Sequence, residues 1–308
     1  MNKMKVLITG ASGFLGKSLI KKLTDEKVTV LALSRTYSTI FDKKNVTWLK
    51  FNFSNISPLI NEIKKFKPEI IYHFYWEDIP NFNKINSSNS LNRSILFFSE
   101  VLNFKSIRKV VVSGSCLEYE KNKGVCKETF YTKPKGDFTW AKNTLRNWLE
   151  IQTNRRMIQF YWFRVFYVFG PWQRSEALIP YILNCLSKKK MPEIQNFTNG
   201  NDYIYIDDVI KIFLNVMNSN IPSGIYNVGT GKSVKVYEIF SIAENIVNKT
   251  NFFDQIQCSF KNQNNKTNHV DFWSDMTKTK IHFNYNKFIC AELAIKKTYD
   301  FFKKRYEN

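Results

Sequence analysis

A glycine-rich turn near the amino terminus limits the folds that this chain of 308 residues can adopt. Gly10, Gly13 and Gly16 are spaced three residues apart, between a short apolar run and a stretch with helical spacing. In a dinucleotide-binding loop the first glycine permits a tight turn, the second lets the backbone approach a pyrophosphate, and the third lets the helix pack closely on the strand. The start of the helix offers its N–H groups to the phosphates. The residues that we expect at a bound dinucleotide are Gly10, Gly13, Phe14, Leu15 and Gly16.

Short apolar runs alternate with amphipathic stretches through the first half of the sequence. The apolar runs predict strands at residues 6–8, 28–33, 46–53, 70–74, 109–112 and 157–165. The amphipathic stretches predict helices at residues 14–23, 57–66, 91–104 and 139–153. Strands that are apolar on both faces and are separated by helices indicate a parallel sheet that is covered on both sides.

The rhythm changes after Gly170 and Pro171, where helical stretches alternate with short strands and loops rich in Asn and Lys. Helices are expected there at residues 179–188, 207–217, 235–247 and 291–302. We therefore predict an α/β fold with a Rossmann doubly wound parallel sheet in residues 1–170. Residues 171–308 are expected to form a smaller α/β substrate-binding domain, and residues 206–219 are expected to return to the first domain.

The second predicted strand ends in Ser34 and Arg35, about twenty residues beyond the glycine loop. In NAD-binding proteins an acidic residue at this point binds the ribose hydroxyls. A carboxylate would repel a 2′-phosphate, whereas a guanidinium can bind it through two hydrogen bonds. Ser34 and Arg35 therefore favour NADP(H), while NAD(H) stays open as the alternative cofactor.

The net charge of +20, from 46 basic and 26 acidic residues, favours anionic partners. The basic residues are scattered, however, and their densest run is Lys188, Lys189 and Lys190. A genome rich in A and T would produce the abundance of Lys, Asn, Ile and Phe without selection for charge. We therefore expect a phosphorylated small molecule and no nucleic acid as the partner, and any RNA binding should be weak and lost steeply with salt.

The five cysteines and three histidines are too few and too widely spaced for a disulfide framework or a metal site. The apolar run near the amino terminus ends at Gly10 and is expected to form a strand rather than a signal peptide. Its longest apolar stretch, residues 160–169, contains Arg164 and is too short to span a bilayer. These features predict a cytoplasmic protein with no metal and no membrane partner.

The glycine loop, which reads TGxxGFxG, is the first of a series of segments that recur in one family of enzymes. The later segments are residues 71–74, 111–115, 164–171, 202–209 and 225–229, together with Asn92. In this order they resemble the extended short-chain dehydrogenase/reductases, also called the NAD-dependent epimerase/dehydratase family. The resemblance implies that residues 71–74 pass under the cofactor and that Asn92 braces the sheet. Further cofactor contacts are expected from Asn52, Phe53, Phe74, Asn92, Lys142 and Phe166.

The chemistry of that family needs a Ser or Thr, a Tyr and a Lys, with the last two spaced as YxxxK on one helix. Ser115 and Lys142 stand where the resemblance places the first and the last of these groups. The residue four before Lys142 is Phe138, which has no hydroxyl and cannot donate a proton. A literal YxxxK begins at Tyr131, but Pro134 inside it disfavours a shared helical face. The catalytic positions are therefore expected at Ser115, Phe138 and Lys142.

Phe138 leaves three interpretations open. The chain carries a Tyr→Phe substitution that removes the acid and keeps the packing, or the natural enzyme works with Ser115 and water, or the protein binds cofactor without catalysis. The rest of the site is intact, which favours the first interpretation. Because a general acid contributes about 10²–10⁴ in rate, this chain is expected to be slow.

Members of the family mostly act on sugars carried by a nucleoside diphosphate, and the resemblance implies such a partner here. Residues 114–119 and Trp76 are most similar to branches that reduce a 4-keto sugar during deoxysugar synthesis for surface polysaccharide. A 4,6-dehydratase would have an Asp-Glu pair directly after the serine position. Cys116 and Leu117 stand there instead, so dehydration is not expected.

Two departures from the family pattern affect the substrate side. Tyr167 replaces an asparagine, and Asn201 replaces an arginine that binds the diphosphate in relatives, with Arg174 as a candidate substitute. The expected substrate contacts are Trp76, Ser115, Cys116, Tyr167, Arg174 and Asn201. Glu77, Asp78 and Glu118 are candidates near the mouth of the pocket, but solvated loop charges are the preferred interpretation. His73 is expected to be a hydrogen-bonded core residue, and Cys116 a small packing residue rather than a nucleophile.

These observations predict an NADP(H)-dependent nucleotide-sugar oxidoreductase, with a 4-ketoreductase as the first choice. The alternatives are a nucleotide-sugar 4-epimerase with tightly bound NAD, and a non-catalytic relative that binds cofactor or RNA. In the family, the helix with the lysine and the long helix before it form a four-helix interface between subunits. Helices 91–104 and 139–153 carry more apolar residues than one buried stripe needs, so we expect a homodimer through them.

Overall fold

The structure is a computed structural model, which describes residues 3–23, 28–35, 44–51, 56–120, 123–218, 220–248, 250–255 and 270–306. The chain divides into two compact units. The first comprises Met1–Glu120, Glu128–Val165 and Ile210–Tyr226, and the second comprises Lys121–Lys127, Phe166–Val209 and Asn227–Asn308. The domain boundary expected after residue 170 stays a prediction. None of the helices in the described ranges is long and apolar enough to cross a membrane.

The first unit is built on one seven-stranded sheet and the helices that connect its strands. The strands are β1 (Met4–Thr9), β2 (Val28–Ser34), β3 (Val46–Lys50), β4 (Ile70–His73), β5 (Lys109–Ser115), β7 (Gln159–Val165) and β11 (Gly224–Val228). The helices are α1 (Phe14–Leu23), α2 (Ser57–Phe66), α3 (Lys84–Val101), α4 (Asp137–Arg155) and α6 (Ile206–Asn218), and a 3₁₀ turn spans Cys116–Glu118.

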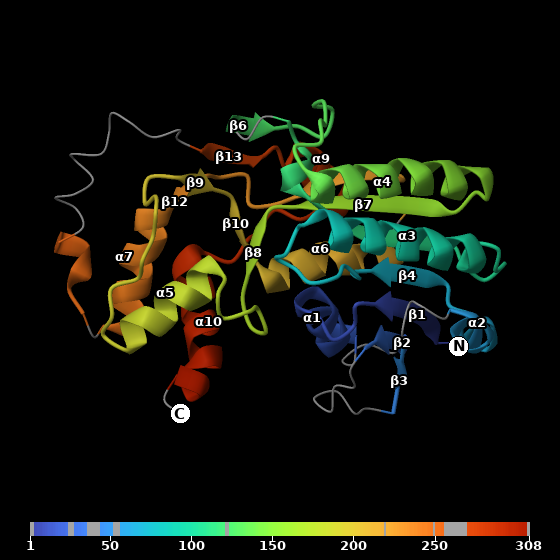
Figure 1. Ribbon diagram of the computed structural model, residues 1–308, viewed down its shortest axis with the longest axis horizontal. Helices are drawn as coiled ribbons and strands as arrows, with labels where there is room; N and C mark the ends of the chain where they lie inside the picture. The colour runs from blue at the N-terminus through green and yellow to red at the C-terminus, as the bar shows by residue number, and fades with distance from the viewer. Residues whose placement is uncertain are drawn as a thin grey trace. The chain divides into compact units, whose positions relative to one another are not determined.

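The strands follow the order β11-β7-β5-β4-β1-β2-β3. Figure 1 labels β7, β4, β1, β2 and β3 of this sheet. From β3 to β7 the described pairings between neighbours are all parallel. The chain winds outward from β1 to β3, then crosses back over the sheet to β4 and winds the other way. This is the strand order of a doubly wound Rossmann sheet, and it confirms the predicted fold.

Neighbouring residues of one strand pack on opposite faces of this sheet, as the two-residue period of a strand requires. On β7, Trp162 joins the core cluster that contains Leu145 of α4, whereas the Phe163 ring stacks 4.6 Å from Phe213 of α6. On β4, the His73 ring lies 4.8 Å from the Phe98 ring of α3. Both faces of the sheet are therefore covered by helices, which explains why its strands carry few polar residues.

Helix α3 begins seven residues earlier than the sequence predicts, at Lys84 rather than at residue 91. Its N-cap is Asn83, whose side chain accepts a hydrogen bond from the Asn86 amide at 2.9 Å. Asparagine is a favoured N-cap because its side chain satisfies an otherwise free N–H of the first turn. The first two turns of α3 are mostly polar, so they lack the regular spacing of apolar residues from which the helix was predicted. The prediction therefore began the helix too late.

The second unit combines two small sheets with helices. Its strands are β6 (Lys123–Cys126), β8 (Tyr167–Phe169), β9 (Gly200–Asn201), β10 (Tyr203–Tyr205), β12 (Val234–Lys235) and β13 (Asp271–Ser274). Its helices include α5 (Leu178–Ser187), α7 (Val236–Val247), α9 (Thr277–Phe283) and α10 (Ala291–Tyr306). One sheet has the mixed order β12-β9-β13-β6, and the other pairs β10 with β8 in parallel.

Candidate active site

The glycine loop joins β1 to α1 in a conformation that excludes side chains at two positions. Gly10 has a φ of +67°, and a Cβ there would lie 2.7 Å from the carbonyl carbon of Phe74. A Cβ on Gly16 would lie 2.4 Å from the Gly10 carbonyl oxygen. Both distances are far below van der Waals contact with backbone atoms that cannot move away. The first glycine therefore permits the tight turn beside the end of β4, and the third lets α1 pack closely against the end of β1, as the sequence predicts.

The second glycine has a different environment. Among the described residues, a Cβ on Gly13 would have the Gly10 carbonyl oxygen, at 3.1 Å, as its close neighbour. The Gly13 amide donates to that same oxygen at 3.0 Å, and Gly13 itself is exposed. Bare backbone at this point, directly before the first turn of α1, is the arrangement that admits a pyrophosphate. Phe14 and Leu15, both half-buried, open that helix.

The end of β2 lies beside the glycine loop. The Ser34 hydroxyl donates a hydrogen bond to the Ser12 hydroxyl, and the Ala11 amide donates to the Leu33 carbonyl at 3.1 Å. Arg35 follows with an exposed side chain, and β2 contains no carboxylate. Asn52 and Phe53, which were expected at the cofactor, lie outside the described residues.

The Lys142 ammonium is buried at the end of β5 among aromatic rings. Its Nζ donates to the Ser113 carbonyl at 2.8 Å and lies 4.1 Å from the centre of the Trp76 ring and 5.9 Å from that of Trp162. Burial lowers the pKa of Lys142 from 10.5 to about 8, and the Glu118 carboxylate opposes this shift. Near neutral pH the site thus contains a desolvated cation held by one carbonyl and by ring faces.

Phe138 lies one helical turn before Lys142, on the buried side of α4. Its ring meets the Trp76 ring edge-on, with centroids 5.5 Å apart, and lies 4.3 Å from the Phe82 ring. Phe82 belongs to the loop between β4 and α3, and 39% of it is exposed. Sequence reasoning did not single out Phe82, because nothing in the local sequence distinguishes it from other loop aromatics.

Ser115 ends β5 and caps the 3₁₀ turn that follows. Its Oγ accepts a hydrogen bond from the Leu117 amide at 3.2 Å, and its own amide donates to the Glu118 Oε1 at 2.8 Å. A hydroxyl has one donor and two acceptor positions, so this cap leaves the Ser115 proton for a further partner. Cys116, the next residue, is buried.

Glu118 is fully buried, so the expectation of a solvated loop charge is wrong. Its carboxylate contacts the Arg146 Nη1 of α4 at 3.1 Å and the Arg164 Nε of β7 at 3.2 Å. The Trp162 indole N–H also donates to it, at 2.9 Å. The spacing Ser-x-x-Glu, a capping box, is the local signal that could have revealed this arrangement.

Two further acidic residues were expected to be solvated, and they differ. The Glu77 side chain forms an ion pair with Arg93 of α3 and is 12% exposed, so the expectation is wrong for this residue. Arg93 lies inside the predicted helix 91–104, but nothing in the local sequence indicates its pairing with Glu77, which is 16 residues earlier. Asp78 is exposed, as expected.

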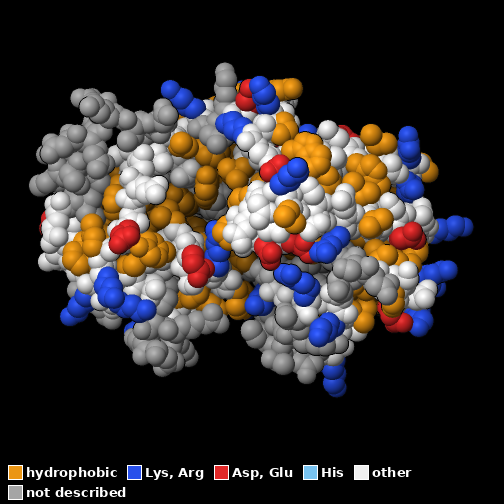
Figure 2. Space-filling model, in the orientation of Figure 1, with side chains coloured by type: hydrophobic (Ala, Val, Ile, Leu, Met, Phe, Trp, Pro, Cys, Tyr) orange, Lys and Arg blue, Asp and Glu red, His pale blue; other side chains and the backbone are white. Residues whose placement is uncertain are grey.

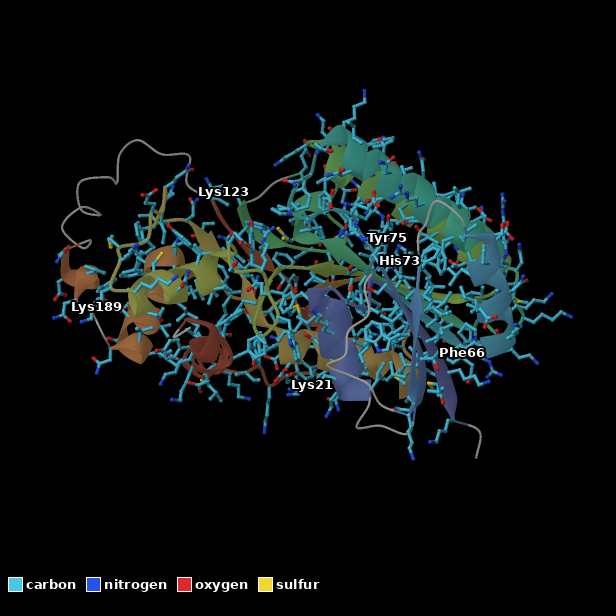
Figure 3. The ribbon with its side chains drawn as sticks, turned by 60° about the horizontal axis from the view of Figure 1, so that its bottom comes forward. Lys21, Phe66, His73, Tyr75, Lys123 and Lys189 are labelled. Carbon is cyan, nitrogen blue, oxygen red and sulfur yellow. The ribbon has the colours of Figure 1, made fainter. Side chains whose placement is uncertain are left out.

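His73 is a buried, hydrogen-bonded core residue, as expected. Its Nδ1 lies 2.9 Å from the Thr9 Oγ1 and its Nε2 lies 3.1 Å from the Ser94 Oγ. Burial lowers the pKa of His73 to about 3, so the ring stays neutral. Figure 3 shows His73 and Tyr75 next to each other, where β4 ends.

Asn92 does not brace the sheet, and that prediction is wrong. Its side chain is exposed, whereas Ser90 and Ser94 of the same helix are buried. Ser94 bonds His73 as described, and the Ser90 hydroxyl accepts from the Glu77 amide at 3.0 Å. Serines on the buried face therefore connect α3 to the end of β4.

The predicted residues of the second unit form a group of their own. The Phe166 ring lies 5.8 Å from Phe272, and the Tyr167 ring lies 5.8 Å from Tyr203. The Asn201 Nδ2 donates to the Tyr203 hydroxyl at 3.3 Å. Arg174 is exposed. The structure thus brings Phe166, Tyr167 and Asn201 together around β8, β9 and β13.

Comparison with known proteins agrees with this geometry. The chain belongs to the NAD dependent epimerase/dehydratase family, whose pattern matches residues 6–229. The family consists of NAD(P)-dependent enzymes of the extended short-chain dehydrogenase/reductase type that modify nucleotide sugars. The family and the enzyme class predicted from the sequence are therefore confirmed.

Two curated relatives are similar over most of their length. CDP-abequose synthase of Salmonella typhimurium is 24% identical over 257 residues, which cover 79% of this chain and 81% of that protein. The dTDP-4-dehydro-6-deoxyglucose reductase of Escherichia coli is 23% identical over 270 residues, which cover 80% of this chain and 83% of that protein.

Two solved structures have the same fold. The UDP-glucose 4-epimerase of Thermotoga maritima with UDP-glucose superposes with a TM-score of 0.83 at 17% identity, covering 98% of this chain and 99% of that one. The UDP-glucuronic acid 4-epimerase of Bacillus cereus in complex with NAD superposes with a TM-score of 0.81 at 19% identity, covering 98% of this chain and 100% of that one.

Proposed function

We propose that this protein reduces the 4-keto group of a nucleoside-diphosphate sugar with NADPH. The observation that carries the proposal is the arrangement at the end of β5, where a Ser115 hydroxyl with a free proton and a buried Lys142 ammonium belong to one unit. These are the groups that the reduction of a carbonyl needs beside a hydride donor. A relative named as a 4-dehydro-6-deoxyglucose reductase supports the same reaction.

The residues of the first unit fit a nicotinamide dinucleotide. The bare backbone at Gly13 and the first turn of α1 suit its pyrophosphate, and Lys142 suits its nicotinamide ribose. When bound in reduced form, the cofactor supplies the hydride that adds to the carbonyl carbon.

The chain's own groups then handle the charge and the proton at the sugar oxygen. The Ser115 hydroxyl donates a hydrogen bond to that oxygen and polarises the carbonyl. The Lys142 ammonium favours the negative charge that develops there and lies in a dry, aromatic environment, in which electrostatic effects are strong. Phe138 cannot deliver a proton, so in this chain the proton comes through Ser115 or from water.

The residues after Ser115 favour reduction over dehydration. A dehydratase must also remove a proton from the sugar and protonate a leaving hydroxyl, which requires an acid and a base. Cys116 and Leu117 occupy the turn directly after Ser115, and Cys116 is 4% exposed. A buried thiol and a leucine side chain do not supply the acid and the base that those steps require.

NADPH is proposed over NADH because of the end of β2. Ser34 is engaged with Ser12 of the glycine loop, and Arg35 presents an exposed guanidinium one residue later. A guanidinium at this point can bind a 2′-phosphate through two hydrogen bonds, and no carboxylate on β2 opposes it.

A homodimer is part of the proposal. Large apolar side chains are exposed along α3 and α4, and Figure 2 shows hydrophobic side chains across this face. They are Ile85, Leu96, Trp140 and Ile151, exposed by 71%, 58%, 46% and 51%. Pairing of the two helices with the same helices of a second subunit would cover these side chains. In a two-fold dimer the same residues of both subunits would lie in the interface.

The test is a turnover assay on a panel of nucleoside-diphosphate 4-keto-6-deoxy sugars with NADPH or NADH, with the products identified by NMR. The proposal expects a C4 alcohol and one equivalent of oxidised cofactor per turnover. Interconversion of C4 epimers without added cofactor, by protein purified with NAD still bound, would instead identify a 4-epimerase. Tight, salt-resistant RNA binding without turnover would identify a non-catalytic relative.

A further inference from the structure

The carboxylate of Glu118 divides its hydrogen bonds between the catalytic turn and the elements behind it. Its Oε1 accepts from the Ser115 amide at 2.8 Å and from the Trp162 indole at 2.9 Å. Its Oε2 accepts from Arg146 at 3.1 Å, from Arg164 at 3.2 Å and, at 3.1 Å, from the same Trp162 indole. One oxygen thus faces the serine, and the other faces two cations from α4 and β7.

The two arginines are themselves held in place. The Arg146 Nη1 donates to the Asn143 Oδ1 at 3.0 Å, and the Arg164 Nη1 donates to the Glu128 carbonyl at 3.2 Å. Both side chains are buried along with Glu118. The carboxylate is therefore positioned by groups that cannot rotate away into solvent.

Gly114 makes room for this carboxylate. A Cβ at Gly114 would lie 2.6 Å from the Glu118 Oε1 and 2.2 Å from the Trp162 Nε1. The glycine directly before Ser115 thus lets the carboxylate and the indole approach the backbone of β5. Glycine, serine and glutamate at these positions act as one unit.

Ser115 is consequently fixed at two points. Its amide is bonded to Glu118, and its Oγ accepts from the Leu117 amide. The anchored amide restrains the backbone at Ser115, and because one lone pair of the hydroxyl faces the Leu117 amide, its proton is left for a partner on another side.

We propose that Glu118 is a positioning residue, which sets the direction of the Ser115 hydroxyl by anchoring the Ser115 amide to the Arg146 and Arg164 pair. This role rests on the proposed function, because it assigns Glu118 an effect on catalysis through Ser115. The proposed role requires no contact between Glu118 and the substrate or the cofactor.

Glutamine at position 118 tests the role with almost no change of shape. The one remaining oxygen must face Arg146 and Arg164, because two cations need an acceptor. The amide nitrogen then faces the Ser115 N–H group, where donor meets donor, whereas the Trp162 indole can still donate to the oxygen at the Oε2 position. Glu118→Gln should therefore break the cap on Ser115 while the fold is retained.

The first measurement is hydrogen exchange in the full chain, which needs no turnover. In Glu118→Gln the Ser115 amide should exchange at least about tenfold faster, while amides in the middle of α4 keep their protection. Glu120→Gln, two residues further on and half-exposed, is the matched control and should leave Ser115 protected. Unchanged protection of Ser115 in Glu118→Gln would overturn the proposal.

The second measurement is a double-mutant cycle on turnover with Ser115→Ala. Glu118→Gln should lower kcat about ten- to a hundredfold, the order expected for a misplaced catalytic group, and leave the KM for the cofactor within about twofold. In the Ser115→Ala background it should have no further effect on kcat. An equal loss of kcat in both backgrounds would show that Glu118 acts elsewhere and would overturn the proposal.

If Glu118→Gln fails to fold, the double variant Glu118→Gln/Arg146→Met removes one charge of each sign and is measured in its place. Arg164 still requires the glutamine side-chain oxygen as its acceptor, so the Ser115 amide is again expected to lose its protection from hydrogen exchange. Faster exchange at Ser115 without turnover of any nucleotide sugar by any variant would overturn the proposed function and support the anchoring role.

Discussion

Two turns at the carboxyl ends of parallel strands build the candidate site by different means. The loop after β1 is fixed by its own backbone, because side chains at Gly10 and Gly16 would collide with neighbouring main chain. The turn after β5 is fixed by charged side chains, with Glu118 held between Arg146 and Arg164. The glycine spacing that defines the first turn lies within one segment, although its backbone also packs against the ends of β2 and β4. The second turn depends on charged side chains from two other elements, α4 and β7.

This difference explains why the two turns tolerate change differently. Replacing a glycine of the first loop displaces backbone, and the damage spreads to the packing of α1 on the sheet. Removing one charge from the buried cluster of Glu118, Arg146 and Arg164 leaves the other charges without a counter-ion. The hydrogen bond between Glu118 and the Ser115 amide is then weakened or lost.

The largest effect is expected from Phe138→Tyr. The added hydroxyl would stand at the proton-donor position, with little change in packing between Trp76 and Phe82. Turnover of a nucleotide 4-keto sugar should rise about 10²–10⁴-fold, with cofactor affinity nearly unchanged. Phe82→Tyr adds the same hydroxyl to the neighbouring ring and should leave turnover unchanged. Equal turnover in the parent chain and in Phe138→Tyr would assign the proton to Ser115 or to water.

The Lys142 charge should make folding stability depend on pH. Burial lowers its pKa from 10.5 to about 8, so across this window the unfolded chain retains a proton that the folded chain has released. Stability contributed by this group therefore rises with pH between about 8 and 10.5, by about 3 kcal/mol in total. Urea unfolding at a series of pH values should show this rise in the parent chain relative to Lys142→Met. A parent and variant that differ by a constant amount would disprove it.

Gly16→Ala tests the backbone-built turn. Its Cβ would lie 2.4 Å from the Gly10 carbonyl oxygen, so α1 must shift and the pyrophosphate site must open. NADPH affinity measured by calorimetry should fall about a hundredfold. Gly136→Ala is the control, since a Cβ there meets no described atom within 4 Å. If both variants bind NADPH equally well, the close approach of α1 is not what builds the site.

The sequence predicted the backbone-built turn well and the charge-built turn poorly. Gly10, Gly13 and Gly16 have a spacing that carries its own geometric explanation, and the Rossmann order follows from apolar strands alternating with helices. Glu118 could not be assigned in this way, because its partners come from α4 and β7, and their approach depends on the folded sheet. Its capping-box spacing to Ser115 was the local part of the signal.

Asn92 shows a related limit of sequence reasoning. The helix that contains it was expected from residue 91, and it begins at Lys84. A start deduced from apolar spacing does not reveal which polar residues face the sheet. In the structure those residues are serines, and Ser94 bonds His73 at 3.1 Å while Asn92 is exposed.

Leu96→Glu tests whether α3 and α4 form a subunit interface. Leu96 is 58% exposed on α3, and in a two-fold dimer each substitution would bury two carboxylates without partners. The dissociation constant of the dimer should rise at least about tenfold, as measured by sedimentation or light scattering at micromolar concentration. Ile281→Glu, on a residue 71% exposed in the second unit, should leave assembly unchanged. A parent chain that is monomeric at micromolar concentration would remove the basis of this prediction.

Arg35→Asp is expected to give the smallest change and to report on the outer end of the backbone-built turn. Arg35 follows β2 with an exposed side chain, next to the Ser34 that bonds the glycine loop. A carboxylate there repels a 2′-phosphate and can accept hydrogen bonds from ribose hydroxyls, so the variant should prefer NADH where the parent prefers NADPH. The loss of NADPH affinity should be about tenfold, the order of one charge-assisted hydrogen bond in a solvated position. Arg108→Asp makes the same charge change on an exposed residue before the amino end of β5, at the opposite edge of the sheet, and should not alter the preference. Calorimetry with both cofactors on the parent and on both variants decides the matter, because a parent that binds NADH as tightly as NADPH would show that Arg35 does not select the cofactor.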